Sequence, residues 1–218
     1  MTNYEELSLQ YILFLNWIKE DRFEPNPVKI LDIGPADVNI EKFLPKNMTI
    51  DTLDIGPENN PGLNPSNTYT YIHDLDKMPT KIKDNSYDVV ICFETLEHVM
   101  YPRKVLKEIK RIAKNNAIIY LSLPNEYNFI QRAYHLFGIK TFCDEPFEIV
   151  EKHLHIHKPR FKDIANLFSS EFKIIKTKPI WQTTKLPRVV DRLINIFLIV
   201  NPSLFSRALT VKAMNIKK

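Results

Sequence analysis

Cysteine is scarce in this chain of 218 residues, which contains only Cys92 and Cys143. Two cysteines provide neither a disulfide framework nor the paired ligands typical of a structural zinc site. The first residues, MTNYEELSLQ, lack the basic and then apolar character of a secretory signal. These absences together predict a protein of a reducing compartment, the cytoplasm.

Long apolar runs and acidic residues are both missing near the end of the chain. The apolar run LINIFLIV is far shorter than the roughly 20 residues that a helix needs to cross a bilayer. Residues 185–218 hold seven Lys or Arg against Asp191 alone, which gives that part +6 and the remainder −2. A nucleic-acid binder usually spreads a basic stripe over its docking face, so this local segment argues against nucleic acid as a partner. We expect residues 187–207 to be core or pocket wall, with peripheral contact to a membrane or a lipid-linked substrate as the alternative.

The length and the 44% of hydrophobic residues fit one domain with a substantial core. Within residues 1–24, apolar side chains at 7, 11, 14, 15 and 18 predict an amphipathic helix over residues 4–22. We expect this helix to pack on the rest of the domain or to form a lid.

Residues 84–125 predict the centre of the fold. Two short apolar runs, 87–93 and 118–123, are typical of buried strands, and an amphipathic helix beginning near Pro102 lies between them. Buried strands joined by a crossover helix indicate a parallel sheet that is covered on both faces. Ligands bind at the carboxyl ends of the strands in such sheets, so residues 92–94 and 124–126 are expected to line a site.

Acidic residues follow several of the other predicted strands. A strand at 28–33 contains Asp32 and is followed by Gly34 and a predicted short helix over 37–44. Strands at 49–53 and 69–72 end at Asp54 and at His73-Asp74, and the strand at 87–93 ends beside Glu94. Asp54 has the spacing of a carboxylate that accepts hydrogen bonds from ribose hydroxyls. Clustered carboxylates repel one another unless a cation or a hydroxyl-rich ligand is present.

The second half of the chain predicts helices over 128–138, 160–168 and 187–200, and strands over 172–180 and 208–216. Within EKHLHIHKP, residues His153, His155 and His157 alternate, which places three imidazoles on one face of an extended segment. They are able to ligate zinc together with Cys143 or Asp144. The alternative is an extended segment with one or two histidines facing a substrate.

These stretches resemble the class I S-adenosylmethionine-dependent methyltransferases, in particular the small-molecule branch with the DVV...LEHV signature. The matching residues are VKILDIGPADVNIEKFL (28–44), IDTLDI (50–55), YIHDLDKMP (71–79), SYDVVICFETLEHV (86–99) and 102–125. The resemblance implies an α/β fold, a Rossmann-like doubly wound sheet of seven strands, mostly parallel with an antiparallel last strand and helices on both faces. It also implies a single domain over 1–218, with a substrate cap inserted at 125–170.

The resemblance further implies S-adenosylmethionine as cofactor and assigns residues to it. Gly34 would let the backbone approach the methionine moiety and Asp32 would fix its amino group. The ribose would bind Asp54, the adenine would bind Asp74 and pack on Leu75, and Phe93 would contact the cofactor by backbone and ring. His98 is the candidate base for a hydroxyl acceptor because its ordinary pKa lies near neutrality, and a loop-shaping hydrogen bond to backbone is the alternative role. His153 and His155, from the cap, are expected to face the substrate.

The sequence departs from the family in the glycine loop, where Ala36 and Val38 replace the second and third glycines. A β-branched valine does not take positive φ cheaply and is expected to crowd the cofactor or the adjoining strand. A catalytically inactive binding or scaffold protein is therefore one alternative function. The other alternative, which follows from the alternate histidines, is a metal-dependent hydrolase that uses the His153/His155/His157 cluster. The leading prediction is methyl transfer to a small-molecule or lipid-linked acceptor.

Overall fold

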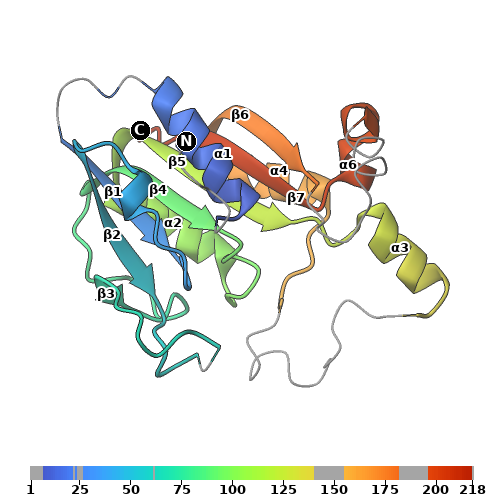
Figure 1. Ribbon diagram of the computed structural model, residues 1–218, viewed down its shortest axis with the longest axis horizontal. Helices are drawn as coiled ribbons and strands as arrows, with labels where there is room; N and C mark the ends of the chain where they lie inside the picture. Colours follow the sequence, from blue (N-terminus) through green and yellow to red (C-terminus); the bar gives the residue numbers. More distant parts are fainter. Residues whose placement is uncertain are drawn as a thin grey trace.

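The computed structural model describes residues 7–21, 23, 27–60, 62–139, 155–181 and 196–217. Seven strands form one sheet in the order β3-β2-β1-β4-β5-β7-β6 (Figure 1). Neighbouring strands are parallel except β7, which is antiparallel to both β5 and β6. The strands are β1 (Val28–Ile33), β2 (Met48–Asp54), β3 (Tyr71–Ile72), β4 (Tyr87–Phe93), β5 (Ala113–Pro124), β6 (Lys173–Ile180) and β7 (Ala208–Met214). The predicted Rossmann-like sheet with an antiparallel last strand is confirmed.

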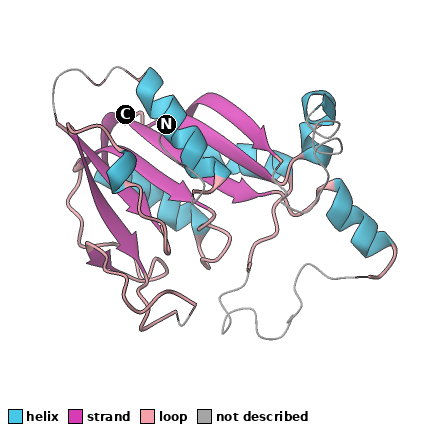
Figure 2. Cartoon of the chain, viewed as in Figure 1, coloured by secondary structure: helices cyan, strands magenta, loops and turns pink. Residues whose placement is uncertain are grey.

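Helices cover both faces of this sheet (Figure 2). One face carries α1 (Leu9–Glu20), and the other carries α2 (Pro102–Ile112) and α4 (Phe161–Ser169) (Figure 1). The structure also describes α3 (Phe129–Leu136), the one-turn α6 (Pro202–Phe205) and a 3-10 turn, η1 (Glu41–Phe43). Among the described residues, no helix has both the length and the apolar character to cross a membrane.

The central strand β4 shows why both faces are covered. Val89, Ile91 and Phe93 pack in the cluster beneath α1, whereas Val90 and Cys92 pack in the cluster beneath α2 and α4. Successive side chains of a strand point to opposite faces, so the five consecutive apolar residues 89–93 need a cover on each side. The β4 run is therefore stable only in the middle of a sandwiched sheet.

The predicted helix over residues 37–44 is wrong. Only the short η1 turn forms there, and the Asn39 side chain accepts a hydrogen bond from the backbone N–H of Glu41 at 3.0 Å. Asn side chains compete with helical backbone bonds in this way, and Pro45 follows too soon for a longer helix to develop. Residues 35–40 consequently form a loop at the carboxyl end of β1.

The described parts of residues 125–170, which are 125–139 and 155–170, contain two helices with different surroundings. Asn128 caps the start of α3 by accepting from the N–H groups of Ile130 and Gln131, and the helix ends at Leu136, two residues before Gly138. In contrast, α4 buries Ile164 and Phe168 in the sheet core, so it is a cover of the sheet. A cap role for the remainder of 125–170 stays a prediction. Of the predicted helix over 187–200, residues 196–200 are helical and the others lie outside the described residues.

Candidate functional site

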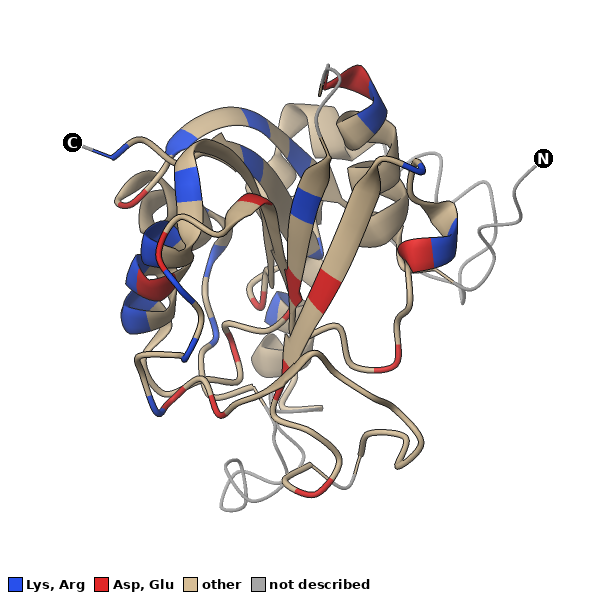
Figure 3. Ribbon diagram, turned by 90° about the vertical axis from the view of Figure 1, so that its left-hand side faces the viewer, with Lys and Arg blue, Asp and Glu red and all other residues tan. Residues whose placement is uncertain are grey.

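A cavity of about 350 Å³ opens at the carboxyl ends of the central strands. Acidic residues recur at the lower ends of the strands and in the loops below them (Figure 3). The lining combines glycine-loop, acidic and apolar residues from segments far apart in the chain: Gly34, Ala36, Leu53, Asp54, Ile55, Asn60, Leu63, His73, Asp74, Leu75, Asp76, Glu94, Thr95, His98, Val99, Met100 and Ile156. This is the edge at which doubly wound sheets bind ligands.

Gly34 is held where only glycine fits. Its φ is +69°, and a Cβ at this position would lie 2.4 Å from Oγ1 and 2.6 Å from Cγ2 of Thr95. The Thr95 hydroxyl is itself fixed, because it donates to the carbonyl of Phe93 at 2.9 Å. The backbone therefore passes directly against the loop after β4, which leaves the cavity side of Gly34 open.

The other two loop positions differ in backbone conformation and in surroundings. Ala36 has a φ of +50°, in the left-handed region that favours glycine, and it lines the cavity. Val38 has no positive φ, and its side chain packs against the cluster beneath α1. Of the two predicted alternatives, crowding of the cofactor or of the adjoining strand, the structure favours the second, because Val38 packs against the cluster that includes Val28 and Ile30 of β1 and does not line the cavity.

Asp54 and Asp74 face the same cavity. The buried Asp54 carboxylate accepts from the N–H of Ile55 at 2.7 Å and from the N–H of Ala36 at 3.1 Å. Asp74 accepts from the N–H of Asp76 at 2.9 Å and lies 3.2 Å from the ammonium of Lys77. A carboxylate has about four lone-pair sites, so each side chain keeps acceptor capacity for a ligand after these bonds.

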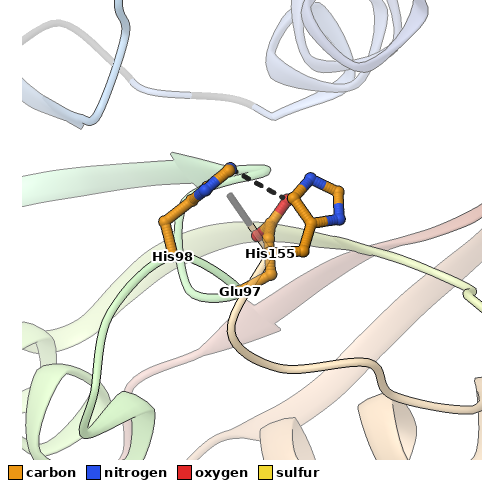
Figure 4. Close-up of side chains that lie close together, drawn as sticks. All are labelled: Glu97, His98 and His155. Carbon is orange, nitrogen blue, oxygen red and sulfur yellow. Dashed lines mark ion pairs between the residues drawn. The ribbon is translucent and has the colours of Figure 1, made fainter. Parts of the chain in front are cut away.

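Histidines and glutamates gather at the other end of the cavity. The rings of His98 and His155 meet edge to face at 4.8 Å, and Nε2 of each lies 3.9 Å from Oε1 of Glu97 (Figure 4). The Glu97 carbonyl accepts from the N–H groups of Ile156 and His157 at 2.9 and 3.0 Å, which holds the two segments together. His98 also lines the cavity.

This group does not consist of the three alternate histidines, His153, His155 and His157, that the sequence suggested as metal ligands. Nε2 of His157 donates to the carbonyl of Val99 at 2.9 Å, and Nδ1 of His155 contacts Oε1 of Glu126 at 2.6 Å. His153 lies outside the described residues, as do the proposed fourth ligands Cys143 and Asp144. His155 is thus paired with residues of other loops, and His157 has a structural bond.

Glu97 is the most unusual member of the group. Its side chain is fully buried, and neither carboxylate oxygen has a hydrogen-bond partner. Burial and then the nearby charge of Glu94 hold the pKa of Glu97 well above its ordinary range, and Glu126 adds to the effect. A buried carboxylate among other carboxylates is costly unless something positive or proton-donating neutralises it.

Comparison with known proteins places this chain in a family. The family model described as a methyltransferase domain matches residues 8–171. The chain belongs to this methyltransferase family. An uncharacterized protein of Methanocaldococcus jannaschii, MJ0638, is 32% identical over 92 residues, which span 42% of this chain and 40% of that protein.

Solved structures support the same fold for the methyltransferase domain. A S-adenosylmethionine-dependent methyltransferase from Mesorhizobium loti gives a TM-score of 0.59 at 15% identity, covering 95% of this chain and 98% of the other. A second, from Methanosarcina mazei, gives 0.58 at 17% identity, covering 93% and 98%. At these identities the likeness shows the fold alone.

Two of the predicted cofactor residues lie outside the cavity lining of this methyltransferase domain. The Phe93 ring packs against Tyr11 of α1 at 5.2 Å, and Glu94 and Thr95 line the cavity beside it. Asp32 is buried on the same side, where its oxygens accept from the Tyr11 hydroxyl at 3.0 and 3.2 Å. The predicted ring contact of Phe93 with a cofactor disagrees with this placement, because strand alternation turns its side chain toward α1.

The burial of Asp32 predicts a pH dependence of stability. Burial raises its pKa from 3.8 to about 7, the bond from Tyr11 lowers it in part, and the charge of Asp54 raises it. Since the folded-state pKa lies above the unfolded value, this contribution to stability is complete below about pH 4 and is lost as the pH rises toward 7. We expect the free energy of unfolding of the wild type to fall relative to Asp32→Asn across this window, by at most about 1.4 kcal/mol per pH unit. Urea denaturation of both proteins at several pH values measures this, and parallel curves would contradict it.

Several residues of the site escaped sequence reasoning. Tyr11 and Glu97 were given no role, and the pairing of Glu126 with His155 was not foreseen, although residues 124–126 were expected to line a site. His98 was a candidate from the sequence, but the approach of His155 to it depends on how the segment after residue 154 returns to the sheet edge.

Proposed function

We propose that this domain binds S-adenosylmethionine in the cavity and transfers its methyl group to an acceptor at the His98 end. The observation that carries the proposal is the close passage of Gly34 against Thr95, beside a cavity lined by Asp54 and Asp74. The close packing of Gly34 on Thr95 holds the loop backbone at the wall of the cavity, where it would contact the amino-acid tail of the cofactor. Two acidic side chains beyond it suit the hydroxyl and amino donors of a nucleoside.

The residues fit this cofactor in type as well as in position. Asp54 would accept from the ribose hydroxyls, Asp74 from the adenine amino group, and Leu75 would pack on the ring. When bound, S-adenosylmethionine supplies a methyl group on a sulfonium, which is already a strong electrophile. The protein's task is therefore to orient the acceptor and exclude water. His98 lines the cavity and contacts His155, and we propose that it contacts the acceptor.

A thermal unfolding experiment with S-adenosylmethionine or S-adenosylhomocysteine tests the proposal. A ligand that binds only the folded state adds about 2.7 kcal/mol at 100 times its Kd. For a domain of this size we expect a rise in Tm of roughly 5–10 °C. Methionine alone, which lacks the nucleoside, is the matched control and is expected to give a much smaller rise. Equal Tm values with and without both nucleosides would favour the inactive scaffold instead.

The alternatives have weaker support. The case for a scaffold came from Ala36 and Val38, yet Val38 packs away from the cavity and Ala36 takes the required φ. The hydrolase required three histidines, of which His157 bonds a backbone carbonyl.

The acceptor class is proposed as a small molecule or a lipid-linked molecule. Exposed apolar side chains favour the lipid-linked member of this pair: Leu136, Phe137, Ile139, Ile196, Ile199 and Val200. They lie on two segments, 136–139 and 196–200, and contiguous exposed apolar residues mark interaction surfaces more often than isolated ones do. Co-sedimentation with anionic lipid vesicles tests this, and protein remaining in the supernatant would restrict the acceptor to soluble molecules.

A further inference from the structure

Three side chains at the acceptor end of the cavity form what we call the carboxylate–imidazole cluster: Glu97, His98 and His155. One ligand atom from each lies within 4.8 Å of the others. Figure 4 shows the Glu97 carboxylate between the two rings. Glu94 and Glu126 flank the cluster, and Glu94 accepts from the Ser122 hydroxyl at 2.5 Å.

The cluster contains a buried carboxyl group, that of Glu97, which no protein donor satisfies at hydrogen-bond distance. Both Glu97 oxygens are buried without a donor, whereas the backbone of the same residue is fully engaged by residues 156 and 157. Removing such a group from water costs several kcal/mol unless a cation or a proton compensates. The cost is increased here because two other glutamates lie nearby. An arrangement of this kind is stable when a cation occupies the space between the ligand atoms.

The contact between His155 and Glu126 prepares the imidazole for a metal. A carboxylate only accepts hydrogen bonds, so at 2.6 Å the Nδ1 of His155 carries the proton. The lone pair of the ring is then on Nε2, the atom that faces Glu97. A carboxylate behind a ligating histidine fixes its tautomer and raises its basicity in metal sites generally. Glu126 thus serves as a positioning residue.

We propose that the carboxylate–imidazole cluster binds a divalent first-row transition-metal ion such as Zn²⁺ or Mn²⁺. Two imidazoles and one carboxylate favour these ions over Mg²⁺ and Ca²⁺, which prefer oxygen ligands. Ligand atoms around a tetrahedral zinc lie roughly 3.4 Å apart, given bond lengths of about 2.1 Å. Nε2 of each histidine lies 3.9 Å from Oε1 of Glu97, and the three ligand atoms lie within 4.8 Å of one another, so rotations of the two half-buried rings would bring them to this spacing.

A metal ion with three protein ligands keeps coordination positions open. Because one of the ligands, His98, lines the cavity, we expect these open positions to face the cavity. These positions would hold an oxygen of the acceptor, because a hydroxyl bound to a divalent cation loses its proton more readily. This part of the inference rests on the proposed methyl transfer and selects hydroxyl acceptors over carbon and nitrogen ones. The metal site itself does not depend on it.

Isothermal titration of chelator-treated protein with ZnCl₂ or MnCl₂ alone, without cofactor, tests the site. We expect one ion per chain, and binding weakened at least about 100-fold in Glu97→Gln, which keeps the shape of the side chain and removes its charge. Glu126→Gln is expected to weaken binding roughly 10–100-fold, as loss of a partner behind a ligand does. His135→Ala, which removes an exposed histidine on α3, is the matched control and is expected to bind as the wild type does.

Thermal unfolding adds a readout that a merely structural role would not produce. Glu97→Gln is expected to abolish the rise in Tm that the wild type shows on adding metal. Equal metal affinity in the wild type and in Glu97→Gln would overturn the proposal, and so would the absence of binding by the wild type. Loss of binding in His157→Ala with retention in Glu97→Gln would also overturn it, in favour of the histidine trio. Because S-adenosylmethionine binding is measured separately, failure of either proposal is recognised independently.

Discussion

Gly34→Ala is expected to abolish S-adenosylmethionine binding and to lower the free energy of unfolding by about 3 kcal/mol. The left-handed φ of +69° costs an alanine about 1 kcal/mol. The new Cβ would also overlap Thr95, whose hydroxyl is held by the carbonyls of Ile33 and Phe93 at 3.2 and 2.9 Å. Relieving that overlap needs a change of the β-branched rotamer and the loss of both bonds, at a further cost of about 2 kcal/mol. Urea denaturation and isothermal titration with the cofactor measure the two effects.

Gly138→Ala is the matched control for this prediction. Gly138 has a similar φ of +62°, but a Cβ there would meet no atom within 4 Å. We expect it to lose only about 1 kcal/mol of stability and to keep its affinity for the cofactor. If the two variants lost stability equally, backbone strain would account for the whole effect and the close approach to Thr95 would have no role.

Asp54→Asn is expected to weaken S-adenosylmethionine binding by about 100-fold or more. Hydrogen bonds to a charged acceptor contribute about 1.5–3 kcal/mol each, and the ribose offers two donors. The amide also replaces one acceptor with a donor, which would face either the N–H of Ala36 or that of Ile55. The NH₂ group of the new amide side chain would then face a backbone N–H in a buried position, and neither donor would have an acceptor. Isothermal titration at fixed salt measures the affinity.

Asp51→Asn is the control for the charge change on the same strand. Asp51 lies on β2 away from the cavity, where it accepts from the Tyr87 hydroxyl at 2.7 Å and pairs with Lys29 at 2.9 Å. Its replacement is expected to lower stability and leave cofactor affinity unchanged. Equal losses of affinity in the two variants would point to a general effect of charge and remove Asp54 from the site.

The proposed metal changes how His98 is understood. From its type and position alone, His98 is a candidate base for a hydroxyl acceptor. In the structure its Nε2 faces the same Glu97 oxygen as Nε2 of His155 does. Two imidazoles on one carboxylate indicate a shared ligand set, in which His98 would act on the acceptor through the bound ion.

The parts of the fold that the sequence predicted are those that depend on local patterns. The β4 strand is apolar at every position from Val89 to Phe93, and α2 repeats its apolar residues at helical spacing, so both elements were recognisable without any partner. The failure at residues 37–44 has the same local origin. A few apolar residues at helical spacing suggested a helix, but Asn39 and Pro45 left room only for a single turn.

The sequence alone determined the order of strands and helices, the position of the glycine turn, and the acidic residues at the strand ends, because each follows from periodicity or from the needs of one residue's backbone. Only the tertiary structure decided that Val38 packs outside the cavity and that Phe93 and Asp32 turn toward α1. It also decided that His155 lies beside Glu97 and His98. Those outcomes depend on which face a strand presents and on where a distant loop returns. Such relations arise from packing between segments many residues apart, which no local pattern specifies.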